Sequence, residues 1–587
     1  MPPAAAHSVL PALEAAANCF RSGNLSEAGR FCETVLDAVP GEANALHILG
    51  IVRLRQGDPK GAVSLLERAA RAAPGNAEVL SNLGAAHRAA GAPVQAARVL
   101  RKAVRKAPDS APIHLNLANA LADAGDADGA ERHYRHVLKA MPNHGGAHRG
   151  LGAVLTSTGR SAEALAVYQA LAAIEPDDPS TLNAIGAIHA EKGNFDAAGA
   201  ELRRALELAP SDSDIAANLA NVCACQFRHA AAAPLYARAI AERPDCPDLL
   251  SNAGNGYVRG GRHEEALDCF RRALDIEPGH PEANAGLANF LLSHGEYAEG
   301  WGAYLTRSSI QGMGPGLYRE RLPSDLAGKK LTVVADQGLG DEIFFLRFAD
   351  ALRRRGAHVT YRPERRLGPM IERARIVDEI MAHDGIPRGD LILAVGDLPY
   401  ALGMEDEDVP PPSITLPPLG ENQASLLAKL EAFGPRPWIG VTWRAGTPNI
   451  RRLLFKEIDY RRLAPVLAKT GGTIVTIQRG VHEGEIEDFE ARIGRPVLDL
   501  SAVNDDVEDM LALSGLLDRY ITVSNTMVHF RAACGGGSDV LVPIPADFRW
   551  MSSGNVSPWF PESRVYRQQA DGDWKHALAS IAERLTA

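Results

Sequence analysis

The sequence predicts an all-α repeat array followed by an α/β region, and three observations support this division. Proline recurs every 34 residues from Pro40 to Pro278. Small residues recur with the same period over the first half of the chain. Beyond residue 330 the pattern changes to short β-branched runs, glycine turns and helical segments, beginning with LTVVADQGLGDEIFFLR at 331–347. A chain of 587 residues is too long for one core, so several folding units are expected.

The first half carries three repeated columns of residues. The columns are Pro40, Pro74, Pro108, Pro142, Pro176, Pro210, Pro244 and Pro278; Ala28, Ala62, Ala96, Ala130, Ala164, Ala198, Ala232 and Ala266; and Gly50, Gly84, Ala118, Gly152, Gly186, Ala220, Gly254 and Ala288. Small residues let two antiparallel helices cross closely, and proline ends the second helix. The columns are typical of the tetratricopeptide repeat (TPR). They predict a superhelix of about nine repeats over residues 1–308.

Asparagine recurs where the first helix of each repeat should face the concave groove of the solenoid. One column holds Asn82, Asn116, Asn218 and Asn252, and a second holds Asn119, Asn221, Asn255 and Asn289. The columns are three residues apart, so both lie on one helical face. An amide can donate to and accept from a peptide backbone, so we expect these residues to bind a polypeptide. The alternative is that they bond to one another or cap turns.

The second half predicts a strand, a tight glycine turn and a helix N-terminus at its start. Further strands are expected at 358–362, 377–381, 390–395, 438–443, 473–478, 497–500, 520–524 and 540–544. Their alternation with helical segments predicts parallel sheets. A polar loop and a helix from about residue 457 to 469 should follow the 438–443 strand. We expect a connector at 309–330 and two Rossmann-like halves at 331–433 and 434–587, joined by the proline-rich stretch 409–420.

Three segments resemble a known family: DQGLGD at 336–341, TVSNTMVHFRAACG at 522–535 and ADFRWMSSGNVSPWFPESRVYRQ at 546–568. They resemble the TPR-linked bacterial glycosyltransferases related to the heptosyltransferases and, more distantly, to the O-GlcNAc transferases. WRAGT and LFKE, in the last third, are most similar to the flagellin glycosyltransferases that use a nonulosonic acid such as pseudaminic acid. The resemblance implies a GT-B fold, in which two Rossmann-like halves face each other across a cleft.

Glycosyl transfer needs a base for the acceptor hydroxyl and cationic groups for the departing nucleotide. The resemblance implies that Asp341 is the base and that Lys456 meets the donor phosphate. From the residues alone, Asp341 can equally be a carboxylate that stabilises a helix dipole. Arg451 and Arg452 are weaker candidates, because arginines in loops are usually solvated.

Further donor contacts are expected at the glycine turn and at two strand ends. These residues are Gly338, Gly340, Arg444, Ser524, Asn525, Thr526 and His529. Hydroxyl and N–H groups at a helix N-terminus favour an anion. The related enzymes usually have Asp where this chain has Asn525, so either the donor differs or the site is weakened. His529 can equally be a structural residue.

Composition and charge exclude several classes of protein. The net charge of −10 argues against a general nucleic-acid binder. The seven cysteines have neither disulfide-framework nor zinc spacing, and no basic leader or long apolar run is present, so a cytoplasmic protein without membrane insertion is expected. The acids Asp505, Asp506, Glu508 and Asp509 should open a helix, so no metal is expected.

The expected function is protein O-glycosylation. The TPR groove would capture a polypeptide acceptor, preferably flagellin, and the GT-B part would transfer a sugar from a nucleotide-activated donor such as a CMP-nonulosonic acid. No other cofactor is expected. One alternative is a UDP-GlcNAc-type enzyme that modifies varied proteins. Another is a non-catalytic TPR scaffold with a degenerate GT-B domain.

Overall fold

The computed structural model describes residues 3–310, 312–313, 316–449 and 454–586. The chain divides into two compact units, the first comprising Met1–Lys192 with Ala200–Pro210 and the second Gly193–Gly199 with Ser211–Ala587. The boundary expected at residue 308 therefore lies inside the second compact unit. The last repeats belong to the same compact unit as the sheets, for reasons of packing given below.

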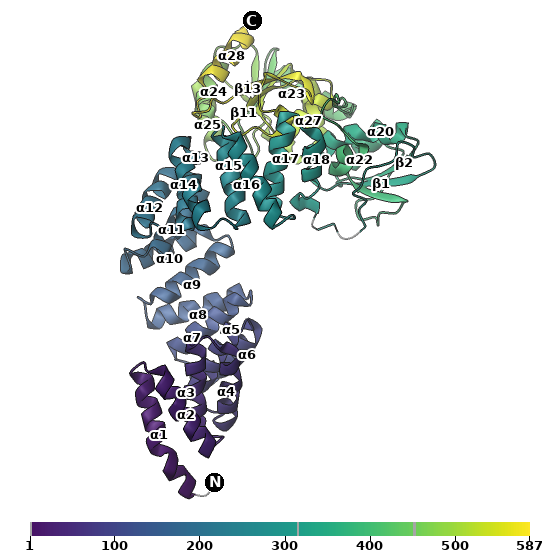
Figure 1. The fold of residues 1–587 in the computed structure, drawn as a ribbon. Coiled ribbons are helices and arrows are strands. Elements are labelled where there is room, and N and C mark those ends of the chain that lie inside the picture. Colours follow the sequence, from purple (N-terminus) through teal and green to yellow (C-terminus); the bar gives the residue numbers. More distant parts are fainter. Residues whose placement is uncertain (1–2, 311, 314–315, 450–453, 587) are drawn as a thin grey trace. The chain divides into compact units, whose positions relative to one another are not determined.

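Antiparallel helix pairs form the repeat region, drawn from purple to teal in Figure 1. The helices are α1 (Pro3–Arg21), α2 (Leu25–Ala38), α3 (Ala43–Arg55), α4 (Pro59–Ala72), α5 (Ala77–Ala89), α6 (Pro93–Lys106), α7 (Ala111–Asp123), α8 (Ala127–Ala140), α9 (Gly145–Ser157), α10 (Ser161–Ile174), α11 (Pro179–Glu191), α12 (Phe195–Leu208), α13 (Ser213–Cys225), α14 (His229–Glu242), α15 (Pro247–Arg259), α16 (His263–Ile276), α17 (Pro281–His294) and α18 (Tyr297–Tyr304). The predicted TPR solenoid is confirmed. Within the described residues none of the helices is long and apolar enough to cross a membrane.

The turn inside each repeat uses a residue with positive φ. The glycines of this column are Gly23, Gly57, Gly91, Gly125, Gly159, Gly193, Gly261 and Gly295. Phe227 replaces glycine in the seventh repeat and still has a φ of 58°. Its ring contacts Gly572, where any Cβ would lie 2.4 Å from the ring, and the Arg259 guanidinium lies 4.4 Å from the ring centre. The strained residue thus fixes this repeat to the C-terminal part of the chain.

The second unit contains two main sheets and a hairpin. The strands are β1 (Lys330–Val334), β2 (His358–Arg362), β3 (Glu379–Ile380), β4 (Leu391–Ala394), β5 (Trp438–Thr442), β6 (Arg444–Asn449), β7 (Leu454–Glu457), β8 (Thr473–Thr476), β9 (Leu498–Asp499), β10 (Arg519–Val523), β11 (Asp539–Val542), β12 (Val556–Ser557) and β13 (Phe560–Arg567). The first sheet has the order β3-β2-β1-β4 and the second β12-β13-β11-β10-β5-β8-β9. All pairs in these two sheets are parallel except β12 with β13, as expected from the alternating pattern.

Helices cover the sheets and complete two hydrophobic cores. They are α19 (Leu339–Phe345), α20 (Ala349–Arg354), α21 (Gly368–Ala374), α22 (Leu398–Leu402), α23 (Gly420–Phe433), α24 (Tyr460–Leu467), α25 (Glu485–Ile493), α26 (Val507–Leu516), α27 (Thr526–Ala533) and α28 (Lys575–Thr586), with short 3₁₀ turns η1 (Ser308–Ile310), η2 (Leu346–Phe348), η3 (Val395–Asp397), η4 (Ser501–Asp505) and η5 (Phe548–Trp550). One core joins the first sheet to α26 and α27. The other packs the second sheet on α24, α25 and α28.

Several expected elements are placed differently. The polar loop after β5 forms the β6–β7 hairpin, and α24 begins at Tyr460 because Asp459 caps it, accepting from the Arg461 N–H at 3.0 Å. Helix α23 packs on α26, which faces the second sheet, although it was assigned to the first half. Strand β13 was not predicted, because a proline and charged residues at its exposed positions hide its alternation.

Trp301 in α18 is the main link between the repeats and the α/β core. Its side chain is only 1% exposed. Its ring centre lies 5.9 Å from that of Phe345 in α19, 5.5 Å from Phe548 and 5.9 Å from Trp559. A chain cut at residue 308 would expose this aromatic cluster, so the repeats following Ser211 depend on the sheets for their packing.

Replacing Trp301 by Ala should lower the free energy of unfolding of the second unit by about 3–5 kcal/mol, because the change leaves a large cavity in the core. Urea denaturation followed by far-UV circular dichroism measures this loss. Phe433→Ala is the control, since Phe433 is 41% exposed and its loss should cost less than about 0.5 kcal/mol. Equal effects of the two substitutions would show that Trp301 is not an anchor.

Candidate functional site

The candidate site is a cavity of about 330 Å³ in the second unit. Asn255, Val258, Ala285, Gly286, Asn289 and Phe290 line it from α15 and α17; Ala303, Tyr304, Arg307, Ser308 and Ser309 line it from α18 and the turn that follows; and Gln337, Asp341, Lys456, Pro545, Asp547, Phe548 and Arg549 line it from the α/β part. Repeat helices and both sheet regions therefore contribute to one cavity. It brings the predicted catalytic residues Asp341 and Lys456 together with the predicted acceptor residues Asn255 and Asn289.

Four charged side chains form an alternating chain along one wall. Arg549 donates from Nη2 to Asp341 Oδ1 and from Nη1 to Asp547 Oδ1, the latter at 3.0 Å. Lys456 Nζ lies 3.1 Å from Asp547 Oδ2. The Arg549 guanidinium also lies 4.5 Å from the ring centres of Phe344 and Phe548. Asp341 follows β1, and Asp547 and Arg549 follow β11, so the arginine joins the two sheets.

Burial and charge together set the protonation of this chain. Burial alone would raise the pKa of Asp547, but Lys456 and Arg549 hold that pKa well below its usual range. Burial alone would lower the pKa of Arg549, but Asp547 and Asp341 raise it. Asp547 is therefore an anion and Arg549 a cation at neutral pH.

The local sequence explains how these groups are positioned. Gly338 is the N-cap of α19 and places Asp341 in its first turn. The segment after β11 is fixed to the repeats, because Asn289 donates to the Ala546 carbonyl at 3.0 Å and accepts from the Phe548 N–H at 2.9 Å. Both ends of the Arg549 bridge thus sit on ordered backbone.

A second group of ion pairs, formed by Arg307, also lines the cavity. Arg307 donates from Nε to Asp336 at 2.7 Å and also pairs with the buried Asp397. The Tyr304 hydroxyl donates to Gln337 Oε1 at 2.9 Å. Arg307 follows α18, and Asp336 and Asp397 follow β1 and β4, so the end of the repeat region is fixed to the carboxyl edge of the first sheet.

Arg444, predicted to contact the donor, lies outside the lining of this cavity. Its guanidinium forms a bidentate pair with Glu485, at 2.8 and 3.0 Å, and donates to the Gly480 carbonyl at 3.0 Å. Burial opposes ionisation of Glu485, but Arg444, the His482 N–H and Trp443 Nε1 lower its pKa to about 2. Arg444 is thus committed to holding α25 on the end of β5. Arg451 and Arg452 lie outside the described residues.

Ser524, Asn525 and Thr526 also lie outside the cavity lining, at the start of α27. The Asn525 amide donates to Tyr520 Oη at 2.9 Å and to Thr522 Oγ1 at 2.8 Å, while its oxygen accepts from the Val528 N–H at 3.3 Å. The side chain is therefore a helix cap inside a polar network. The network uses both the donor and the acceptor of the amide.

Gly340 and His529, two further predicted donor residues, pack against each other. A Cβ on Gly340 would lie 2.9 Å from His529 Cδ2 and 3.4 Å from Thr526 Cα. His529 is buried between Phe344 and Phe560, and this burial, with Arg549 nearby, holds its pKa well below the usual range. The neutral ring thus fills the junction of α19 and α27. The glycine turn serves this close approach.

Gly340→Ala should destabilise the protein by about 1–3 kcal/mol, because the new methyl group overpacks the junction with His529. The double variant with His529→Ala should be more stable than the sum of the two single losses predicts, since removing the ring makes room. Thermal unfolding measures both. Gly471→Ala is the matched control, as a Cβ there would meet nothing within 4 Å. Additive losses would contradict the proposed contact.

The asparagine columns are mostly engaged in intramolecular bonds. In the first unit Asn82 bonds His47 Nε2 at 2.8 Å, Asn116 donates to Ser81 Oγ at 3.0 Å, and Asn119 accepts from the Tyr134 hydroxyl at 2.7 Å. In the second unit Asn221 accepts from the Tyr236 hydroxyl at 2.7 Å. Asn218 and Asn252 are half-buried, and Asn221 and Asn255 are each only 8% exposed. These side chains are therefore engaged or partly buried within the solenoid, and peptide binding by the two columns stays a prediction.

The sequence interpretation did not single out Asp547, Arg549, Tyr304 or Arg307. The first two lie in the motif ADFRWM, whose acidic and basic residues at i and i+2 were the available signal. Asp506 caps α26 by accepting from the Glu508 N–H at 2.8 Å, as expected for acids that open a helix. Within the described part of the chain, His, Cys, Asp and Glu side chains form no group of three or more that could hold a metal.

Asp547→Asn should lower the unfolding free energy by about 3–5 kcal/mol at neutral pH, because it leaves the buried Arg549 with less negative charge. The folded-state pKa of Asp547 is depressed, so its stabilisation is complete above the unfolded value of about 3.9 and is lost as the pH falls below it. The difference in stability between the variant and the wild type should therefore become smaller below about pH 4. Melting temperatures from pH 3 to 8 measure it, with the exposed Asp37→Asn as control. A pH-independent gap would contradict the ion pair.

Comparison with known proteins supports the repeat region. One family model described as tetratricopeptide repeat matches residues 53–114, 87–132, 121–188 and 257–300, and a second matches residues 183–247. The chain is 30% identical over 330 residues to Protein FlbA of Caulobacter vibrioides, a match covering 50% of this chain and 53% of that protein. The chain thus spans about half the length of this curated relative.

Comparison with solved structures gives several matches, each to a part of the chain and with a TM-score below 0.5. A chain of the APC/C hetero-tetramer Cut9–Hcn1 is 17% identical, with a TM-score of 0.37 over 46% of this chain and 52% of that one. MamA is 26% identical, with a TM-score of 0.26 over 27% and 94% of the two chains. YrrB, described as a TPR protein with an unusual peptide-binding site, is 23% identical, with a TM-score of 0.27 over 32% and 96%.

Proposed function

We propose that this protein is a protein O-glycosyltransferase of the GT-B type. Its repeats would hold a polypeptide acceptor, and its two-sheet part would transfer a sugar from a nucleotide-activated donor to Ser or Thr. The observation that carries the proposal is the 330 Å³ cavity, in which Asp341, Lys456 and Arg549 share one space with Asn255 and Asn289 of the repeats. Its size and its few convergent polar groups are typical of a small-molecule site.

The charged wall supplies the groups that this reaction requires. Lys456 and Arg549 would stabilise negative charge on the departing nucleotide phosphate. Asp341 would take the proton of the acceptor hydroxyl as the new glycosidic bond forms. In the structure Asp341 is paired with Arg549, so its carboxylate is engaged in an ion pair. An anionic donor competing for Arg549 would release the Asp341 carboxylate, which could then accept a hydrogen bond from the acceptor hydroxyl.

The acceptor would approach along α15 and α17, which carry Val258, Ala285, Gly286 and Phe290 on the cavity wall. Ala285 presents only a methyl group on this wall, whereas Gly286 allows the close packing of Phe270, whose ring would lie 2.5 Å from a Cβ at that position. TPR grooves generally bind peptides or other proteins. Flagellin is the preferred acceptor and a nonulosonic acid the preferred sugar, because WRAGT and LFKE resemble the enzymes that join this pair. A UDP-GlcNAc-type transferase with varied acceptors is the alternative.

A non-catalytic scaffold is favoured by a different observation. The Asn525 amide and the Arg444 guanidinium are both engaged inside the fold, and neither lies in the cavity. A degenerate transferase domain that retains only its packing roles would have this arrangement. Sugar transfer by the purified full chain distinguishes the two functions.

Lys456→Ala should lower turnover by about 10²–10³, since it removes a cation that stabilises the leaving phosphate. Asp341→Asn should lower it by about 10² or more while donor binding is retained, because the amide cannot accept the proton. The intact mass of flagellin incubated with enzyme and a CMP-nonulosonic acid or UDP-GlcNAc measures transfer, and calorimetry measures donor binding.

The matched control is Lys469→Ala, which removes the same charge from an exposed position on the second sheet's domain. It should transfer sugar at the wild-type rate. Wild-type turnover by folded Lys456→Ala would exclude a role for Lys456. Absence of any mass increase on either donor, with the wild-type protein, would favour the scaffold.

A further inference from the structure

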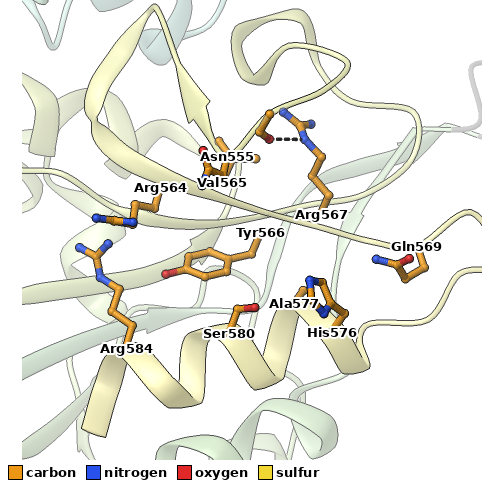
Figure 2. Close-up of a pocket in the computed structure, with 11 residues that line it drawn as sticks. Asn555, Arg564, Val565, Tyr566, Arg567, Gln569, His576, Ala577, Ser580 and Arg584 are labelled. Carbon is orange, nitrogen blue, oxygen red and sulfur yellow. Dashed lines mark hydrogen bonds between the residues drawn. The ribbon is translucent and has the colours of Figure 1, made fainter. Parts of the chain in front are cut away.

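A second cavity, of about 490 Å³, lies between β13 and α28. Arg564, Tyr566 and Arg567 line it from the strand, and His576, Ser580 and Arg584 line it from the helix (Figure 2). It shares no lining residue with the candidate catalytic cavity. It is therefore a separate site on the second sheet.

Its wall is strongly basic in a chain whose net charge is −10. Three guanidinium groups and one imidazole line it, and the described lining residues include no Asp or Glu. The buried Asp539 lies behind this wall, where it accepts from the Tyr566 hydroxyl at 3.2 Å and lies 3.5 Å from Arg584 Nε. The described lining of the cavity itself therefore carries positive charge without a carboxylate of its own.

Arg567 and the backbone at Arg584 are held in place before any ligand binds. Arg567 donates to the carbonyls of Gly554, Met551, Trp550 and Ser553, at 2.6–2.9 Å. The backbone at Arg584 is fixed by Arg519, which donates to its carbonyl at 2.9 Å. The Arg584 side chain is 39% exposed, so an anion in the cavity can reach its guanidinium.

The charges fall into two groups. Figure 2 shows the guanidinium groups of Arg564 and Arg584 near the hydroxyl end of Tyr566, and Arg567 and His576 towards the other end of the cavity. Ser580 lies between them on α28 and can add a hydroxyl donor. Two cationic ends joined by a neutral floor fit a ligand with two negative groups.

We propose that this cavity binds a small molecule carrying a diphosphate group. One phosphate would bind Arg584 and Arg564, whose forked donors match phosphate oxygens. The other would lie in the field of Arg567 and His576. The exposed part of the Arg584 guanidinium would donate to the first phosphate. The proposal is independent of sugar transfer in the other cavity.

Calorimetric titration of the full chain at 0.15 M salt tests the site, with pyrophosphate, a nucleoside diphosphate and orthophosphate as probes. Arg564→Gln and Arg584→Gln should each weaken diphosphate binding at least 10-fold. Ser580→Glu, which places a carboxylate in the cavity while keeping every arginine, should abolish it. Arg238→Gln removes one exposed arginine of the repeats and should change the affinity less than about twofold.

The outcomes separate the possibilities. Pyrophosphate binding as tight as that of the nucleoside diphosphate supports an inorganic ligand in this cavity, and tighter nucleotide binding supports an organic one. Binding lost in Lys456→Ala but kept in the cavity variants would assign the anion to the catalytic cavity and overturn the proposal. Absence of binding by the wild-type chain, or equal loss in Arg238→Gln, would also overturn it. Arg564 is exposed, so its variant should fold even if Arg584→Gln does not.

Discussion

The ion pairs of the Arg549 guanidinium are the interactions on which the architecture of the candidate cavity depends. The guanidinium is nearly buried, and it joins a carboxylate that follows β1 to one that follows β11. Removing a guanidinium from water is expensive, and the two carboxylates and the faces of Phe344 and Phe548 offset that cost only while all of them stay in place. This one side chain thus joins the two sheets at the cavity, in addition to the shared hydrophobic core, and balances the negative charge of the cavity wall.

The repeats contribute to the same arrangement. Asn289 bonds the backbone on both sides of Asp547, and Trp301 packs on Phe548, so α17 and α18 support the segment that carries the bridge. A polypeptide held by α15 and α17 would therefore contact helices that also bond the segment carrying Asp547 and Arg549. Recognition and chemistry would share one rigid scaffold, which is how positioned substrates gain in rate.

Sequence reasoning could predict the features that depend on a local sequence pattern. The 34-residue period reflects helix-pair geometry, and β-branched runs mark buried strands, so the repeats and most parallel strands were predicted. The Arg549 bridge depends on residues 208 positions apart and leaves no periodic trace. The internal bonds of the asparagines were not predicted, although the sequence carried a signal for two of them. Tyr134 and Tyr236 stand 15 positions after Asn119 and Asn221 and bond them, and this spacing was readable in the sequence.

Phe227 and Trp301 give the two ends of the solenoid different freedom to change. Repeats in the first compact unit contact mainly their neighbours, so a lineage could gain or lose a whole 34-residue repeat there at little cost to the rest of the fold. The repeats from Ser211 onward pack on the part of the chain that contains the sheets through Phe227, which has a positive φ, and through the buried Trp301. Variation in repeat number among descendants should therefore accumulate before Ser211, and the last three repeats should be kept.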